Sequence, residues 1–546
     1  MVTNLNDSGE GSLREAVKGN DPKIVVFNVG GVIALDGEDF KIGDNTTIAG
    51  QTAPAPGITL RYSTIRPGNN NIIRFIRVRR GEEKNPNDGA DAIFTRGRTG
   101  VIIDHCSFSW SIDEVASNYD NNNFTMQWCT AAEGLDTGHS KGDHSYGGIW
   151  GGKLASFHHN LIAHVLNRVP RFNGARYENT NIDFKDNLLY DEYQWENCVQ
   201  AENVDFRNCV MYNWGDTNGC YGGPGGGQIN IINNYYKGGP ITPDDKANRV
   251  TQISVATEGN SKGHPNMYDM TSRYYINGNT TETNKGEITK NRDYDGVKLD
   301  KGTVSIDGAR WSKDENHFYD ESVPRKTYDG ASYIRINMDE PAPEGDITTH
   351  DAETALEKIL EHCGASLHRD AIDARYMEEV RTGTAECEGS TSGTQGILDL
   401  ASDAIDYYNE TNFPTGEHPA NFDTDGDGMP DEWEKANGLD PNDPTDASET
   451  TVDKEKGWYT NIEVYANSLV QHIVKEQNAD GESNYTEYYP DCVPTGIENI
   501  NAGASEVERI EYYTLGGVKL NEPAKGISIR KITFTNGKTV TDKVIK

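Results

Sequence analysis

The sequence is poor in cysteine, in basic residues and in long apolar runs, and each shortage excludes a class of protein. Only 8 of its 546 residues are cysteine, too few for a disulfide framework in so long a chain. No apolar run approaches the length of a membrane span. With a formal net charge of -35, the chain also lacks the basic surface that nonspecific nucleic-acid binding requires.

What the chain has in quantity is turn residues. Glycine occurs 57 times, whereas hydrophobic residues make up only 35% of the sequence. This composition favours many short strands joined by turns over long helices. Because 546 residues also exceed one ordinary globular core, we expect several domains or one elongated repeat architecture.

Short strand-like segments recur between about residues 20 and 240, each with asparagine or cysteine at a turn. These landmarks lie 21 to 31 residues apart, at Cys106, Cys129, Asn160, Asn187, Asn208 and Asn234. That spacing is typical of solenoid coils with loops of variable length. Few Asn-Gly hairpin signals fall between the segments, which disfavours an antiparallel sandwich or propeller. We therefore predict an all-β fold, a right-handed single-stranded parallel β-helix with long loops over residues 1–345.

The remaining residues have other patterns. Apolar residues at helical spacing predict a helix over residues 351–363 that ends at Gly364. We assign residues 346–494 to a helical and calcium-loop extension, and residues 495–546 to a small β-rich domain with strand-like runs at 510–517 and 526–530. This tail resembles the C-terminal sorting or attachment domains of secreted Bacteroidetes-type proteins.

One acidic segment has the ligand spacing of an EF-hand calcium loop. Loop positions 1, 3, 5 and 9 are Asp423, Asp425, Asp427 and Asp431, position 6 is Gly426, and position 12 is Glu434. Met429 would contribute its backbone carbonyl. The alternative is a solvated acidic turn. A full set of protein ligands leaves no position for substrate, so we expect a structural ion here.

A second constellation runs through four motifs in order, at residues 71–80, 102–107, 158–160 and 167–171, with acids at Asp91, Asp113 and Glu114. In this order the motifs resemble polysaccharide lyase family 1, the pectate and pectin lyases, over about residues 1 to 240. The resemblance implies a parallel β-helix that binds Ca²⁺ and cleaves galacturonan by β-elimination.

The resemblance also implies roles for single residues. It places the first calcium aspartate at Asp91, and the acid of the next coil at Asp113 or Glu114. Where many members have one more acid, this chain has Ser117 and Asn118. Water, a backbone carbonyl or substrate would then complete the coordination.

The catalytic arginine of the family falls on Arg168 and a second arginine on Arg171, while a third position holds Asn173. Arg176 or another residue would have to compensate for that third arginine. The substrate-binding lysine falls on Lys141, although another alignment would put Tyr146 or His144 there. Adjacent residues of a strand point to opposite faces, so we expect His158 and His159 to stack structurally.

These residue types suit the chemistry. The proton on C5 of galacturonate lies beside a carboxylate, so its removal builds charge on a group that is already negative. Calcium and cationic side chains stabilise that charge. Arginine is an unusual base, because its guanidinium normally stays protonated, but neighbouring positive charges lower its pKa.

Other functions fit less well. A polygalacturonase would need a cluster of aspartates as general acid and base, and Gly138-His139-Ser140 lacks such a pair. A pectin lyase would not need the calcium acids, and a noncatalytic polysaccharide-binding β-helix remains an alternative. We expect a monomer that acts on polygalacturonate or pectin. We also expect secretion or an outer-surface location, with a signal peptide removed before Met1.

Overall fold

The computed structural model describes most of the chain. The described residues are 1–36, 38–81, 90–174, 202–215, 219–225, 227–254, 259, 271–299, 305–306, 309–310, 337–342, 345–404, 407, 413–483, 487–493, 507–513, 519–520, 527–534 and 539–545. The chain divides into two compact units, residues 1–428 with 470–489 and residues 429–469 with 490–546. Each unit is described by itself.

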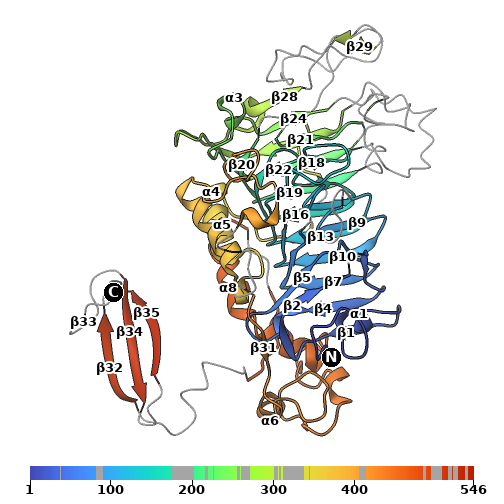
Figure 1. Cartoon of the computed structure of the whole chain (residues 1–546), viewed down its shortest axis with the longest axis vertical. Helices are drawn as coiled ribbons and strands as arrows, with labels where there is room; N and C mark the ends of the chain where they lie inside the picture. The colour runs from blue at the N-terminus through green and yellow to red at the C-terminus, as the bar shows by residue number, and fades with distance from the viewer. Residues whose placement is uncertain are drawn as a thin grey trace. The chain divides into compact units, whose positions relative to one another are not determined.

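The first unit is a right-handed parallel β-helix, as the sequence predicts (Figure 1). Each coil contributes one strand to each of three sheets, and strands of successive coils pair in parallel. Sheet one contains β1 (Lys23–Val25), β4 (Thr46–Ala49), β7 (Asn71–Arg74), β10 (Thr99–Asp104), β13 (Asn122–Gln127), β16 (Lys153–His158), β19 (Asn203–Arg207), β22 (Gln228–Ile232) and β25 (Arg273–Asn277).

Sheet two contains β2 (Val29–Ala34), β5 (Ile58–Arg61), β8 (Ile76–Arg79), β11 (Ser107–Ser109), β14 (Thr130–Ala132), β17 (Leu161–Val165), β20 (Val210–Trp214), β23 (Tyr235–Lys237) and β26 (Thr280–Glu282), with antiparallel end strands β27 (Ile288–Thr289) and β31 (Gly416–Glu417). Sheet three contains β3 (Phe40–Lys41), β6 (Ile65–Arg66), β9 (Ile93–Arg96), β12 (Ala116–Tyr119), β15 (Ile149–Trp150), β18 (Arg171–Phe172), β21 (Tyr221–Gly222), β24 (Thr251–Ile253) and β28 (Val297–Leu299).

Most of the predicted landmarks form a ladder inside the turn between sheets one and two, in which Cys209 takes the place predicted for its neighbour Asn208. The Cys129 N–H donates to Asn160 Oδ1 at 2.9 Å, and the Cys209 N–H donates to Asn234 Oδ1 at 2.9 Å. Strand β16 pairs directly with β19, so the ladder passes from Asn160 to Cys209. Asn187 lies outside the described residues. Side chains that satisfy buried backbone groups in this way keep successive coils in register.

An aromatic stack follows the same turn, one ring per coil. The His105 ring centroid lies 4.7 Å from that of Phe75 and 6.1 Å from that of Trp128, and the Trp128 and His159 centroids are 4.2 Å apart. His159 Nε2 contacts His350 Nδ1 at 2.9 Å, and burial is the main cause that lowers the pKa of His159 well below its usual value. The stacked structural role predicted for His159 is therefore confirmed.

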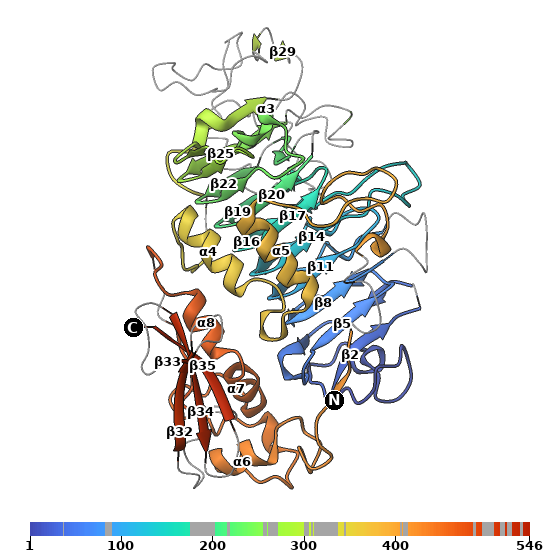
Figure 2. The same cartoon turned by 60° about the vertical axis from the view of Figure 1, so that its left-hand side comes forward.

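Helices cover sheet two (Figure 2). Helix α4 (Ala352–His362) matches the predicted helix, and its N-cap Asp351 accepts from the Thr354 N–H at 2.7 Å. Apolar residues of α4 and of α5 (Ala371–Thr382) share one buried cluster with residues of sheet two. The shorter helical elements of this unit are α1 (Leu13–Ala16), α3 (Asp244–Ala247), α8 (Gln471–Gln477), η1 (Gly50–Thr52), η5 (Asp293–Gly296), η6 (Ser366–His368) and η7 (Ala401–Asp403). A short pair, β29 (Ser305–Ile306) and β30 (Ala309–Arg310), is antiparallel.

The second unit contains α6 (Asp431–Asn437), η9 (Asp446–Ser448) and α7 (Asn461–Ser468), with Trp433 packed against Tyr465. It also contains an antiparallel sheet of β33 (Lys519–Leu520), β32 (Val507–Tyr513), β34 (Ile527–Phe534) and β35 (Thr539–Ile545). The β-rich tail is thus confirmed as strands, while its sorting role and the domain boundaries at 345 and 494 stay predictions. Among the described residues, no helix has the length and apolarity to cross a bilayer.

Candidate active site

The candidate site forms where successive turns lead into sheet three. Asp91 precedes β9, Glu114 precedes β12, Tyr146 precedes β15 and Arg168 precedes β18. Parallel bridges join Glu114 to Tyr146 and Tyr146 to Asn167. Since stacked strands lie about 4.8 Å apart, residues far apart in sequence meet along one edge of the β-helix.

Three acids meet at this edge. Asp91, Asp113 and Glu114 each offer a carboxylate oxygen within 4.8 Å of the others. Asp91 is 5% exposed, its Oδ1 accepts from the Glu114 N–H at 3.1 Å, and its buried Oδ2 has no hydrogen-bond partner among the described residues. Burial, then repulsion from Asp113, raises the pKa of Asp91 well above its usual value. Oxygen ligands of this kind suit a hard divalent cation, which would relieve that repulsion.

Arg168 supplies the positive charge of the site. Its guanidinium forms an ion pair with Glu114, and its side chain is 18% exposed. The guanidinium carbon also lies 4.5 Å from the centroid of the Tyr146 ring, a cation–π geometry. The backbone N–H of Arg168 donates to Asn167 Oδ1 at 2.8 Å. Glu114 and the Tyr146 ring therefore hold the guanidinium from two sides.

Arg171 lies at the start of β18, three residues after Arg168. Its neighbour Phe172 is fully buried in the core, so Arg171 points away from the core, since adjacent strand residues face opposite sides. The guanidinium carbon of Arg171 lies 5.6 Å from the centroid of the Tyr221 ring. The sequence did not single out Tyr221 or Tyr146 as partners of these arginines.

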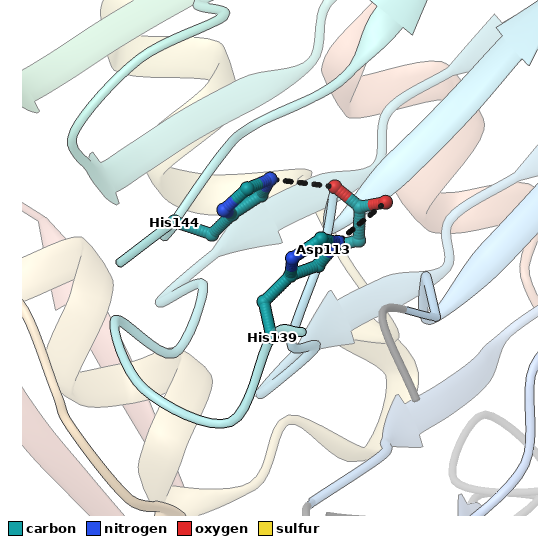
Figure 3. A group of neighbouring side chains, drawn as sticks. All are labelled: Asp113, His139 and His144. Atoms are coloured by element: carbon teal, nitrogen blue, oxygen red, sulfur yellow. Dashed lines mark ion pairs between the residues drawn. The ribbon is translucent and has the colours of Figure 1, made fainter. Parts of the chain in front are cut away.

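Two histidines approach Asp113 from the loop before Tyr146 (Figure 3). His139 Nε2 lies 3.5 Å from Asp113 Oδ2, and His144 Nε2 lies 3.4 Å from Asp113 Oδ1. The two imidazoles stack with centroids 3.7 Å apart, and the His144 centroid lies 4.3 Å from that of Tyr146. Burial is the first cause that lowers the pKa of His139, against an opposite effect of Asp113. Lys141, on the same loop, is exposed.

The structure thus brings together Asp91, Asp113, Glu114 and Arg168, and it places Arg171 on the adjacent strand. Burial and Asp113 raise the pKa of Asp91, and Ser117 opposes them only as a smaller effect. Arg176 lies outside the described residues. The sequence did not assign His139 to the site, because its contact with Asp113 depends on the conformation of the loop.

The acidic loop is divided between the two units. In the first unit, Asp423, Asp425 and Asp427 offer carboxylate oxygens within 4.8 Å of one another. Asp423 accepts from the N–H groups of Gly426 at 2.7 Å and Gly428 at 2.8 Å. Gly426 has φ +79°, a left-handed conformation that favours glycine at the sharp turn of such a loop.

The other predicted ligands of this loop belong to the second unit. Met429 and Glu434 are fully buried, and Asp431 is in the first turn of α6, with an ion pair to Lys435 at 3.4 Å. The ring of Trp433, between them in sequence, packs in the interior of that unit. The carboxylates along this loop provide oxygen ligands, which calcium prefers.

Comparison with known proteins gives close relatives. No family model matches the chain. It is 31% identical over 478 residues to a protein of Aspergillus flavus named "Probable pectate lyase C", covering 86% of this chain and 89% of that protein. A protein of the same name from Neosartorya fischeri is 32% identical over 482 residues, with the same coverage. A third, from Aspergillus fumigatus, is 31% identical over 483 residues.

Solved structures are more distant. The thermostable pectate lyase PL 47 has 14% identity and a TM-score of 0.37, covering 67% of this chain and 91% of that one. A pectate lyase bound to a hexasaccharide has 14% identity and a TM-score of 0.29, covering 60% and 68%. These similarities are too low to support the fold, which the parallel strand pairing shows directly.

Proposed function

Since this chain belongs to the pectate lyase family of its relatives, we propose that it cleaves α-1,4-linked polygalacturonate by calcium-assisted β-elimination. The products would be 4,5-unsaturated oligogalacturonides. The single observation that carries this proposal is the gathering of Asp91, Asp113 and Glu114 beside the Arg168 guanidinium. A cation site next to an arginine suits a polymer whose every sugar has a carboxylate.

We assign the active-site cation to Asp91, Asp113 and Glu114. Calcium bound there would neutralise the substrate carboxylate and so stabilise the charge that develops during elimination. The choice of calcium rests on the all-carboxylate donor set. A second calcium ion, of structural type, is assigned to Asp423, Asp425, Asp427, Asp431 and Glu434, with the Met429 carbonyl.

Arg168 is assigned as the base. Its nitrogen would take the C5 proton, the electron pair of the C5–H bond would form the C4–C5 double bond, and O4 would leave with the electrons of the C4–O4 bond. In the structure the guanidinium is paired with Glu114, which occupies the group that would meet the C5 proton. Proton abstraction therefore requires this pair to open when substrate binds.

Two further residues are assigned to substrate. Arg171 would clamp a sugar carboxylate through its planar pair of N–H groups. Lys141 is exposed on the loop that carries His139 and His144, where an ammonium would meet a second carboxylate of the polymer. Action on an extracellular polysaccharide further suggests secretion or an outer-surface location for a monomeric enzyme.

The test is an assay for unsaturated uronides by their ultraviolet absorbance. The purified chain is mixed with polygalacturonate in calcium, in chelator, and with fully methyl-esterified pectin. We expect product from polygalacturonate in calcium alone. Product from esterified pectin in chelator would favour a pectin lyase. Binding without product under every condition would favour a noncatalytic polysaccharide-binding β-helix.

A further inference from the structure

The imidazole of His144 is anchored through one ring nitrogen. Its Nδ1 lies 3.1 Å from the Gly142 carbonyl oxygen and 3.0 Å from the Asp143 carbonyl oxygen. A carbonyl oxygen can only accept, so Nδ1 carries a hydrogen and donates. In neutral imidazole Nε2 then holds a lone pair. That lone pair faces Asp113 Oδ1 at 3.4 Å (Figure 3).

His139 has the opposite arrangement. Its Nδ1 accepts from the Lys141 N–H at 2.9 Å, so the hydrogen of its neutral ring lies on Nε2, which faces Asp113 Oδ2 at 3.5 Å. One oxygen of Asp113 therefore faces a donor and the other faces an acceptor. Two acceptors that face each other are repulsive unless a proton or a cation lies between them.

We propose that a divalent transition-metal ion, of the class of Zn²⁺ and Co²⁺, binds between His144 Nε2 and Asp113 Oδ1. Two ligands of a tetrahedral ion at ordinary bond lengths are about 3.3–3.4 Å apart, close to the separation observed here. Metal-bound imidazoles commonly donate their other N–H to a backbone carbonyl, as His144 does. His139 orients Asp113 through the second carboxylate oxygen.

The donor set decides the class of ion. Calcium takes oxygen ligands, whereas imidazole suits zinc, cobalt and nickel. The site therefore differs from the cluster of Asp91 and Glu114, although both use Asp113. The side chains of Asp113 and His144 are 21% and 10% exposed, so water or a sugar carboxylate can complete the coordination. The alternative to a bound metal ion is a doubly protonated His144, because its Nε2–H would donate to Asp113 Oδ1.

Cobalt binding to the full chain distinguishes a metal site from a doubly protonated His144. The protein is stripped with chelator, returned to calcium buffer to fill the oxygen sites, and titrated with CoCl₂ at pH 8, where an ordinary imidazole is mostly neutral. We expect one equivalent of Co²⁺ by calorimetry, with a visible absorption band. H144Q should lose the band and at least tenfold in affinity, and H139Q about tenfold, as for outer-sphere partners. H472Q, which removes an exposed histidine of α8, should bind like wild type.

Equal cobalt binding by wild type and H144Q, or no binding at all, would overturn the proposal. Anomalous scattering from a cobalt-soaked crystal of the wild type gives the same answer without a variant. A peak about 2.0–2.1 Å from His144 Nε2 is expected, and its absence would also refute the site. Neither readout depends on lyase activity, so failure here would leave the proposed function standing.

Discussion

The guanidinium carbon of Arg168 lies 4.5 Å from the centroid of the Tyr146 ring, at the end of a stack that continues through His144 to His139. A cation over an aromatic face gains about 0.5–2 kcal/mol, more when the pair is shielded from water. The ring also restricts the orientation of a long side chain. Tyr146 is therefore a positioning residue for the arginine that we assign as base.

The first prediction concerns this stack. Tyr146→Leu should lower kcat on polygalacturonate about tenfold with little change in KM, because a loss of 1–2 kcal/mol at the reacting group is felt in the transition state. Tyr146→Phe keeps the ring and should retain near-normal kcat. Steady-state kinetics at saturating calcium measure both. Equal damage from the two substitutions would assign the effect to the hydroxyl group and contradict the stacking account.

The second prediction concerns Asp91. The pKa of Asp91 is raised in the folded chain. An acid with a raised pKa loses stability for the fold as pH rises through its folded-state pKa. Without a cation, the charged form of Asp91 therefore destabilises the folded chain. In chelator at neutral pH, Asp91→Asn should therefore unfold at the same or a higher temperature than wild type. It should also need at least tenfold more calcium for half-maximal turnover. The exposed Asp21 provides a control, Asp21→Asn, and a calcium requirement unchanged in D91N would remove Asp91 from the ligand set.

The third prediction concerns the acidic loop. Asp427→Ala should lower the melting temperature in calcium but not in chelator, because an ion bound only to the folded state stabilises it, by about 2.7 kcal/mol at a hundredfold excess over Kd. Turnover at low temperature should be unchanged. Glu432→Ala, at an exposed non-ligand position of the same loop, is the control. If D427A and E432A melt alike in calcium, the loop holds no stabilising ion.

The fourth prediction concerns a buried ion network under α5. Burial acts to raise the pKa of Glu379, but His164, 3.0 Å away, and then Arg375 outweigh it and lower that pKa to about 2. For an acid of lowered pKa, stability is present above the unfolded value of about 4.3 and is lost as pH falls toward 2.

Urea unfolding between pH 6 and 2 measures this effect. The wild type should lose about 3 kcal/mol of stability across the window through this group alone, and Glu379→Gln should show a flatter profile from a lower start. Its neighbour Glu378 is 61% exposed, so Glu378→Gln should follow the wild type. Parallel profiles for wild type and E379Q would show that Glu379 does not titrate in this way.

The repeat could be predicted from the sequence because its cause is local. Cys129, Asn160 and Asn234 recur where a turn needs a small polar or thiol side chain, and that need repeats once per coil. The spacing could not show which coils are neighbours. A long insertion lies between Asn160 and Cys209, yet their strands pair directly.

The site was predictable only in part, for the same reason. Asp91, Glu114 and Arg168 follow motifs with a fixed place on the coil, so they could be found from sequence. His139, His144 and Tyr146 meet through the conformation of a loop, and their contacts with Asp113 and Arg168 depend on side-chain directions that no spacing encodes. The choice between Asp113 and Glu114 had stayed open, and the structure brings both to the cluster.

The most direct test of the proposed mechanism is the turnover of Arg168→Lys on polygalacturonate at saturating calcium, followed by the absorbance of unsaturated product. Lysine keeps the charge but loses the planar guanidinium. We predict that kcat falls by orders of magnitude while substrate affinity changes little, and that Arg171→Ala weakens binding as well. Near-normal turnover by a folded R168K enzyme would contradict the assignment of Arg168 as the base.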